Sequence, residues 1–299
     1  MICDLHNDIL TSGLSDGEIK AYLDVALKDC DILTIAAWTT ESKPSLLSLS
    51  ETFQKYSKYK NVVFAVEDMG FLRDDDEKQT LKNLEEFFTL PCGSTPIIYA
   101  GLVWNNENCF GGGAFSDAGL TGAGKAAISF FNDINMNSHD YRCAQHLDFA
   151  HMNRKTFYAA AEACRKPILC SHACFDECVP KDAPHYNIAR ARNLDGEQTG
   201  LIVQSGGLIG LTFVATFLNG TPDCASGDII RHIDYFVQKH GYKNLAIGTD
   251  YFGTKELPAD VKEYKDFPVI VEKLSKLGYP AAAIDGILFA NCKRFLDNL

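Results

Sequence analysis

Short runs of consecutive apolar residues alternate along this chain with longer segments whose apolar residues recur at helical spacing. Each run is about as long as a strand that is buried on both faces of a parallel sheet. The eight runs cover residues 2–6, 32–38, 62–67, 96–104, 145–151, 167–172, 208–214 and 244–250. Eight strand–helix units in a chain of 299 residues predict a (β/α)8 barrel of the TIM type. A doubly wound open sheet would bury similar strands and stays the alternative.

Helix-capping patterns support this alternation. Ser15 followed by Glu18 fits a capping box ahead of an apolar stripe at helical spacing. Asn153 can cap the helix that precedes the sixth strand. Gly241 is suited to ending the helix whose apolar stripe includes Ile233. Because no low-complexity linker divides the sequence, we expect a single domain over residues 1–299.

Composition places the chain among ordinary globular proteins. Apolar residues make up 46% and charged residues 22%, which is enough to bury a sizeable core. The net charge of −11 repels phosphate backbones, so we expect no nucleic-acid partner. The 11 cysteines are irregularly spaced and form no CxxC pair. We therefore expect free thiols at Cys174 and Cys178, and apolar-run cysteines such as Cys292 that act as small hydrophobic residues.

The sequence carries no recognisable targeting signal. A signal peptide needs a basic start and an apolar stretch of about 7–15 residues, and the chain begins with neither. No apolar run approaches the length of a membrane span. We therefore expect a cytoplasmic protein without a membrane partner, and a homodimer stays open.

Side chains that can bind metals fall at the ends of the predicted strands. On the first strand, His6 and Asp8 are two residues apart, so both face the same side. The full set of such residues is His6, Asp8, Glu67, His151, His172 and Asp250. In barrel enzymes the catalytic groups come from the C-terminal ends of several strands. The sequence therefore predicts a metal-dependent active site at that end of the barrel.

The residue types suit two divalent ions, with zinc as the expected metal. His6 and Asp8 would hold the first ion, and His151 and His172 would complete the second. Glu67 is the natural bridge, because the two cations must lie about 3.5–4 Å apart. A hydroxide between the ions would be the nucleophile. Asp250 would orient it and move its proton.

The order and context of these residues resemble the renal (membrane) dipeptidase family of the amidohydrolase superfamily, in a bacterial-type form. The first-strand motif of that family is matched by Asp4-Leu5-His6-Asn7-Asp8. Further family motifs are matched in order at residues 66–70, 148–151, 167–173, 192–194, 248–253 and 291–295. The resemblance therefore runs along essentially the whole chain.

The resemblance implies a metallopeptidase that cleaves dipeptides, often with a D-residue on the C-terminal side. It implies that Arg192 binds or orients the carboxylate or carbonyl of the substrate, as a forked guanidinium can. The 173–191 segment is longer than is usual in the family, so we expect a lid there, and Arg190 stays the competing choice. The family's substrate-contacting histidine on the fourth strand is missing. Trp104 and Asn105 stand there instead and are expected to contact substrate.

Two other kinds of function stay open. One is a different metal-dependent amidohydrolase, such as a lactonase, a deaminase or a β-lactam-opening enzyme. Members that bridge their metals with a modified fourth-strand lysine have no counterpart here, because that strand has no lysine and Glu67 ends the third. The other is a non-catalytic binding protein built on the same barrel. Loss of one or more ligands would mark such a protein, and the full set is present.

Overall fold

The structure is a computed structural model that describes residues 1–38, 46–88, 97–133 and 145–297. Its strands follow one another in chain order around a closed barrel. They are β1 (Cys3–Asn7), β2 (Ile32–Ala37), β3 (Val62–Val66), β4 (Ile97–Gly101), β5 (His146–Asp148), β6 (Leu169–Ala173), β7 (Leu208–Leu211) and β8 (Leu245–Ile247). Each strand overlaps one of the predicted apolar runs, and the (β/α)8 prediction is confirmed.

Helices alternate with the strands along the described chain. They are α1 (Asp16–Ala26), α2 (Leu46–Tyr56), α3 (Glu77–Phe88), α4 (Gly122–Asp133), α5 (Arg154–Ala163), α6 (Tyr186–Arg192), α7 (Gly196–Gln204), α8 (Ala215–Asn219), α9 (Ser226–His240), α10 (Pro268–Lys276), α11 (Ala281–Asp285) and α12 (Asn291–Asp297). Short helical turns, η1 (Ile9–Thr11), η2 (Met69–Leu72), η3 (Asp176–Cys178), η4 (Tyr264–Asp266) and η5 (Gly286–Ala290), lie in the connections. None of the described helices is long and apolar enough to cross a bilayer.

The described residues fall into two compact units. The first unit combines Met1–Leu33 with the described residues from Cys170 onward, and the second unit is Thr34–Leu169. The expectation of a single domain over residues 1–299 stays a prediction.

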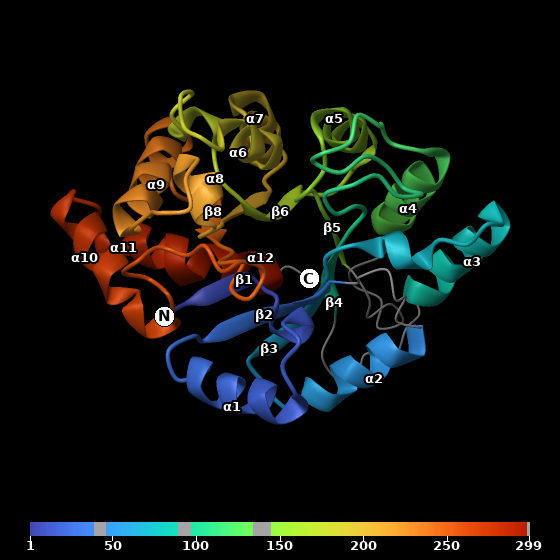
Figure 1. Cartoon of the computed structure of the whole chain (residues 1–299), viewed down its shortest axis with the longest axis horizontal. Coiled ribbons are helices and arrows are strands. Elements are labelled where there is room, and N and C mark those ends of the chain that lie inside the picture. The colour runs from blue at the N-terminus through green and yellow to red at the C-terminus, as the bar shows by residue number, and fades with distance from the viewer. Residues whose placement is uncertain (39–45, 89–96, 134–144, 298–299) are drawn as a thin grey trace. The chain divides into compact units, whose positions relative to one another are not determined.

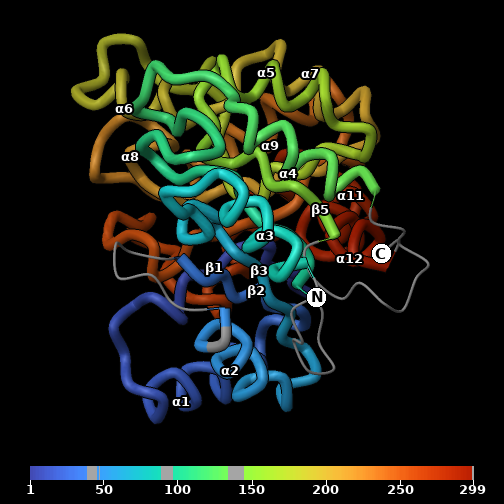
Figure 2. The backbone as a smooth tube through the Cα atoms, turned by 90° about the vertical axis from the view of Figure 1, so that its right-hand side faces the viewer, coloured from blue at the N-terminus to red at the C-terminus, as the bar shows by residue number. Residues whose placement is uncertain are grey.

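In the first unit, β8 pairs in parallel with both β1 and β7. Asp4 lies opposite Ile247 in one ladder, and Gly210 lies opposite Ala246 in the other. Helix α10 packs against α9 (Figure 1), and α6 packs against α8 (Figure 2). These ladders fix the ends of β1 and β8 next to each other, which matters for the residues that follow each strand.

The helix signals read from the sequence are confirmed in the first unit. The Ser15 hydroxyl accepts a hydrogen bond from the amide of Glu18, and the Glu18 carboxylate accepts one from the Ser15 amide. Along α9, Ile229, Ile233 and Phe236 are completely buried. They form the inward stripe that the 3.6-residue period predicts. The apolar core of this unit therefore follows directly from the sequence pattern.

The cysteines required one correction. Cys174 and Cys178 are free thiols, as expected. Cys292, expected to be an unpaired hydrophobic residue, instead forms a disulfide with Cys3, which joins β1 to α12. The expectation was wrong because the two cysteines are 289 residues apart and no local spacing connects them. Only the meeting of the first strand with the last helix brings them together.

The second unit is built on parallel ladders between β3 and β4 and between β4 and β5. Tyr99 of β4 lies opposite Ala65 on one side and His146 on the other. The side chain of Asn153 accepts a hydrogen bond from the amide of Thr156 at 2.8 Å, which confirms the predicted cap of α5. Because the three strands are parallel, their C-terminal ends lie at one edge of the unit.

Candidate metal centre

The predicted site residues fall into two groups, one in each unit. The first unit carries His6, Asp8, His172, Arg192 and Asp250, and the second carries Glu67, Trp104, Asn105 and His151.

In the first unit, hydrogen bonds also join the end of β1 to the residues that follow β8. The amide of Asp250 donates to the carbonyl of His6 at 3.1 Å, and the amide of Asp8 donates to the carbonyl of Tyr251 at 2.8 Å. This pairing brings His6, Asp8 and Asp250 together. One possible ligand atom from each lies within 4.8 Å of the others, and all three residues are buried.

This acidic cluster is suited to a divalent cation. His6 Nε2 lies 3.3 Å from Asp8 Oδ1. Burial, reinforced by the neighbouring carboxylate of Asp8, raises the pKa of Asp250 to about 8, although His6 and Arg192 act in the opposite direction. Two buried carboxylates next to an imidazole are the donors that zinc-type ions take. The residues present therefore fit a metal ion.

A glycine makes the close approach of the two carboxylates sterically feasible. A Cβ atom at Gly253 would lie 2.0 Å from Asp250 Oδ1 and 2.3 Å from Asp8 Oδ2. The backbone turn from Asp250 to Gly253 is unusual as well, because Asp250 has a φ of 62° and Phe252 a φ of 72°. Such left-handed backbone in non-glycine residues is costly and is typical of functional sites. Because of this turn, the Asp250 carboxylate lies so close to position 253 that only a glycine fits there.

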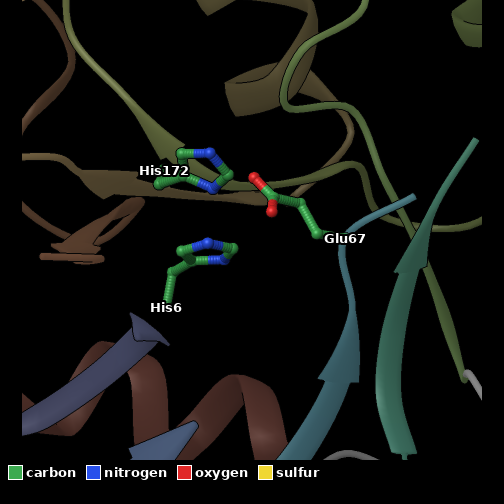
Figure 3. A group of neighbouring side chains, drawn as sticks. All are labelled: His6, Glu67 and His172. Atoms are coloured by element: carbon green, nitrogen blue, oxygen red, sulfur yellow. The ribbon is translucent and has the colours of Figure 1, made fainter. Parts of the chain in front are cut away.

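His172 adds a second imidazole to the first unit. Its ring lies 3.8 Å from the ring of His6, centroid to centroid, with 32° between the planes. Figure 3 shows these two side chains, which come from β6 and β1, together with Glu67, which follows β3. The Ser171 hydroxyl lies 2.8 Å from His172 Nδ1. This contact orients the ring so that Nε2 is the nitrogen available for a metal, as is usual for ligating histidines.

In the second unit, Glu67 and His151 lie in direct contact. His151 Nε2 is 2.8 Å from Glu67 Oε1, and both side chains are buried. Like Asp250, His151 has a left-handed backbone, with a φ of 64°. A carboxylate that follows β3 and an imidazole nitrogen that follows β5 meet here, and together they can share a metal ion.

Asn105 and Trp104 lie against His151. The Asn105 side-chain oxygen is 2.9 Å from His151 Nδ1, so it can accept the proton of that nitrogen and leave Nε2 directed at Glu67. The Trp104 ring lies 5.9 Å from the His151 ring. Sequence reasoning expected Asn105 to contact substrate and missed this contact. No sequence signal indicates it, because the two residues are 46 positions apart.

The geometry distinguishes the two candidate arginines. Arg192, at the end of α6, is buried, and its guanidinium carbon lies 5.1 Å from the centre of the Phe217 ring. It is also near enough to Asp250 to lower the pKa of that carboxyl. The Arg190 side chain is 57% exposed and pairs with Asp176 at 3.7 Å. Arg192 therefore shares its surroundings with the acidic cluster, and Arg190 has a surface ion pair.

Curated relatives of the chain include a dipeptidase. Dipeptidase ataJ from Aspergillus terreus is 25% identical over 155 residues, which cover 51% of this chain and 36% of that protein. An uncharacterized protein in the pqqA 5′ region of Klebsiella pneumoniae is 29% identical over 211 residues, which cover 67% of this chain and 71% of that protein.

Solved structures with the same fold include metallopeptidases. A metallo peptidase from Rhodobacter sphaeroides, liganded with a phosphinate mimic of the dipeptide L-Ala-D-Ala, aligns with a TM-score of 0.75 at 16% identity, covering 99% of this chain and 98% of that one. The probable dipeptidase PvdM from Pseudomonas aeruginosa aligns with a TM-score of 0.64 at 18% identity, covering 93% and 77%. At these identities the likeness shows the fold.

The family itself is shown by a match along most of the sequence. Residues 94–299 fit the family model of the membrane dipeptidases, Peptidase family M19. This segment contains β4 to β8 and therefore His151, His172, Arg192 and Asp250. The chain belongs to the membrane dipeptidase family.

Proposed function

We propose that this chain is a metal-dependent dipeptidase whose two groups of ligands form one binuclear centre. The observation that carries the proposal is that each group pairs imidazole with buried carboxylate at the C-terminal ends of strands. In a closed parallel barrel those ends share one rim, which is where barrel enzymes place their active sites. The first group would supply His6, Asp8 and His172, and the second Glu67 and His151.

Glu67 is the residue best suited to bridge two ions. Its carboxylate has two oxygens, and the Oε1 atom already faces His151 Nε2 at 2.8 Å. The side chain is buried, which limits competition from water. Two bound zinc ions would activate a water molecule and polarise the scissile carbonyl. The protein would supply the geometry, because Asn105 and Ser171 each orient one histidine through its Nδ1 atom.

Asp250 would transfer the proton. It lies beside Asp8 and His6 but follows β8, so its carboxylate faces the cluster from a different strand. Its position is fixed by the bond from its amide to His6 and by the absence of a side chain at Gly253. From there it would accept a proton from the attacking water and deliver it to the departing amine.

Arg192 would bind the substrate's carboxylate or carbonyl. A guanidinium held against an aromatic ring keeps its donors in a fixed plane, which suits planar oxyanions. The Rhodobacter sphaeroides relative of the same fold was solved with a mimic of L-Ala-D-Ala. This supports L,D-dipeptides as the first substrates to test.

The proposed activity can be tested directly with a substrate panel. We expect the zinc-loaded chain to hydrolyse L-Ala-D-Ala and L-Ala-L-Ala, and we expect removal of zinc with a chelator to abolish the activity reversibly. Release of free alanine is the measurement. A lactone and a β-lactam serve as controls. If the chain hydrolyses the lactone or the β-lactam but no dipeptide, the proposed dipeptidase activity is wrong and the chain catalyses another amidohydrolase reaction.

The bridging role of Glu67 predicts a larger metal loss than any terminal ligand would cause. We expect Glu67→Ala to lower the zinc bound per chain, measured by elemental analysis, below the level retained by His6→Ala or His172→Ala, because only the bridge serves both ions. Glu85→Ala, which changes an exposed glutamate of α3, is the matched control and should bind zinc normally. Full zinc occupancy in Glu67→Ala would show that Glu67 is not the bridge.

The proton-transfer role of Asp250 predicts a loss of rate without a loss of metal. Asp250→Asn keeps the size of the side chain but removes its basicity, so we expect kcat to fall about 10²–10⁴-fold. Zinc content, measured on the same samples, should stay close to that of the unchanged protein. Loss of zinc in this variant would instead make Asp250 a ligand, and near-normal turnover with zinc bound would exclude the proton-transfer role.

The substrate-binding role of Arg192 predicts an effect that Arg190 does not share. We expect Arg192→Lys to lower kcat/KM by about tenfold to a hundredfold, because an ammonium cannot reproduce a forked, charge-assisted contact. Arg190→Lys is the matched control and should leave kcat/KM unchanged, since its partner is Asp176 at the surface. The reverse pattern in steady-state kinetics would assign the role to Arg190.

A further inference from the structure

We propose that Asp4 is a positioning residue, which holds the end of β1 against the end of β8 and thereby sets the spacing between His6 and Asp250. The inference rests on the proposed function, because it concerns the same metal centre. Asp4 lies two residues before His6 on β1 and is completely buried. It belongs to neither of the groups of clustered ligand atoms found among the described residues.

The carboxylate of Asp4 accepts four hydrogen bonds. Its Oδ2 atom accepts from the hydroxyls of Thr249 and Tyr264, each at 2.6 Å. Its Oδ1 atom accepts from the backbone amides of Thr249 at 2.8 Å and His6 at 3.1 Å. The donors come from β1 itself, from the residue before Asp250, and from η4. One buried side chain therefore connects three segments that are far apart in sequence.

The surrounding donors fix the direction of these bonds. The amide of Tyr251 donates to the Thr249 hydroxyl at 3.2 Å, and the Asn7 side-chain nitrogen donates to the Tyr264 hydroxyl at 3.0 Å. Each hydroxyl thus accepts one bond and directs its own proton to Asp4. Two hydroxyls and two amides all donate, so the position calls for a group that only accepts, which an ionised carboxylate is.

The network is joined to the proposed centre through the backbone. The Thr249 hydroxyl lies 3.3 Å from the carbonyl of His6, and the same carbonyl accepts the amide of Asp250 at 3.1 Å. Any movement of Thr249 relative to Asp4 therefore moves the amide of Asp250 relative to His6. A partner of this kind outside the ligands themselves typically contributes about tenfold to a hundredfold in metal affinity or activity.

A purely structural role for Asp4 makes a different prediction. A buried carboxylate that only joined β1 to β8 would contribute to the free energy of unfolding, and its loss would leave folded molecules with a normal centre. A positioning role requires that folded molecules also bind metal less tightly. Zinc affinity separates the two roles, because it is measured on the folded protein and does not depend on turnover.

The experiment compares variants that remove one donor to Asp4 at a time. Thr249→Val removes a hydroxyl at nearly constant shape, Tyr264→Phe removes another, and Thr249→Ser keeps the hydroxyl. Ser226→Ala is the matched control. Ser226 is the first residue of α9, in the same unit, and its hydroxyl donates a hydrogen bond to the carboxylate of Asp260 at 2.5 Å, which the substitution removes. Zinc dissociation constants come from competition with a chelator, melting temperatures from thermal unfolding, and kcat and KM from the zinc-saturated enzymes.

We expect Thr249→Val and Tyr264→Phe to weaken zinc binding about tenfold to a hundredfold. We expect Thr249→Ser to restore it, and Ser226→Ala to lower the melting temperature without changing zinc affinity. At saturating zinc, kcat should fall more than KM rises in the first two variants. If both variants bind zinc and turn over like the unchanged protein, Asp4 has only a structural role.

The unchanged protein separates this inference from the proposed function. If it binds zinc but hydrolyses no dipeptide, the proposed reaction is wrong, while the zinc affinities of the variants still decide the role of Asp4. If it binds no zinc, both proposals are overturned. Should Thr249→Val fail to fold, Tyr264→Phe carries the same comparison, because it removes a donor to the same Oδ2 atom.

Discussion

The parallel pairing of β1 with β8 is the constraint on which the acidic cluster depends. Each strand alone carries one acidic residue near its end, and neither would form a metal site by itself. Pairing continues past the end of β8 through the carbonyls of His6 and Tyr251. It forces the Asp8 and Asp250 carboxylates into the same buried space, where their mutual repulsion has a cost that a cation can offset. The ladder between the strands is therefore part of the site.

The same constraint explains the left-handed turn after β8. Asp250 adopts a φ of 62°, which lets it follow the strand and still point at Asp8. The chain then passes so close to both carboxylates that there is no room for a side chain at position 253, where the residue is glycine. Local strain of this kind, on the order of 1–3 kcal/mol per residue, persists where the surrounding structure enforces it. Here the surrounding structure is the bonded network around Asp4 and Thr249.

The sequence was sufficient to predict the barrel and the types of residue that lie at the ends of its strands. Consecutive apolar runs located every strand that the structure describes, because strands buried on both faces read as near-continuous apolar runs. Strand ends then identified His6 and Glu67 as predicted ligands, since parallel strands end on one rim. Resemblance to a family identified Arg192, and burial against Phe217 now distinguishes it from Arg190.

The partners of those residues could not be predicted, because each is distant in sequence. Asn105 meets His151 across 46 positions, and Thr249 meets Asp4 across 245. Neither contact leaves a periodic signal, and an amide or hydroxyl in a loop is compatible with many roles. Such pairs are specified only when the barrel closes. Sequence patterns therefore located the predicted ligands and left their supporting hydrogen bonds unknown.

The disulfide between Cys3 and Cys292 has a topological consequence. It links positions 289 residues apart, so in the oxidised protein the segment from Cys3 to Cys292 is a covalent ring. In the chain-entropy description, closing so long a loop restricts the unfolded ensemble by about 5–6 kcal/mol, against about 3 kcal/mol for a loop of about 15 residues. A ring also has no separable halves. A single backbone cut anywhere between the two cysteines would linearise the molecule while leaving every residue attached to it.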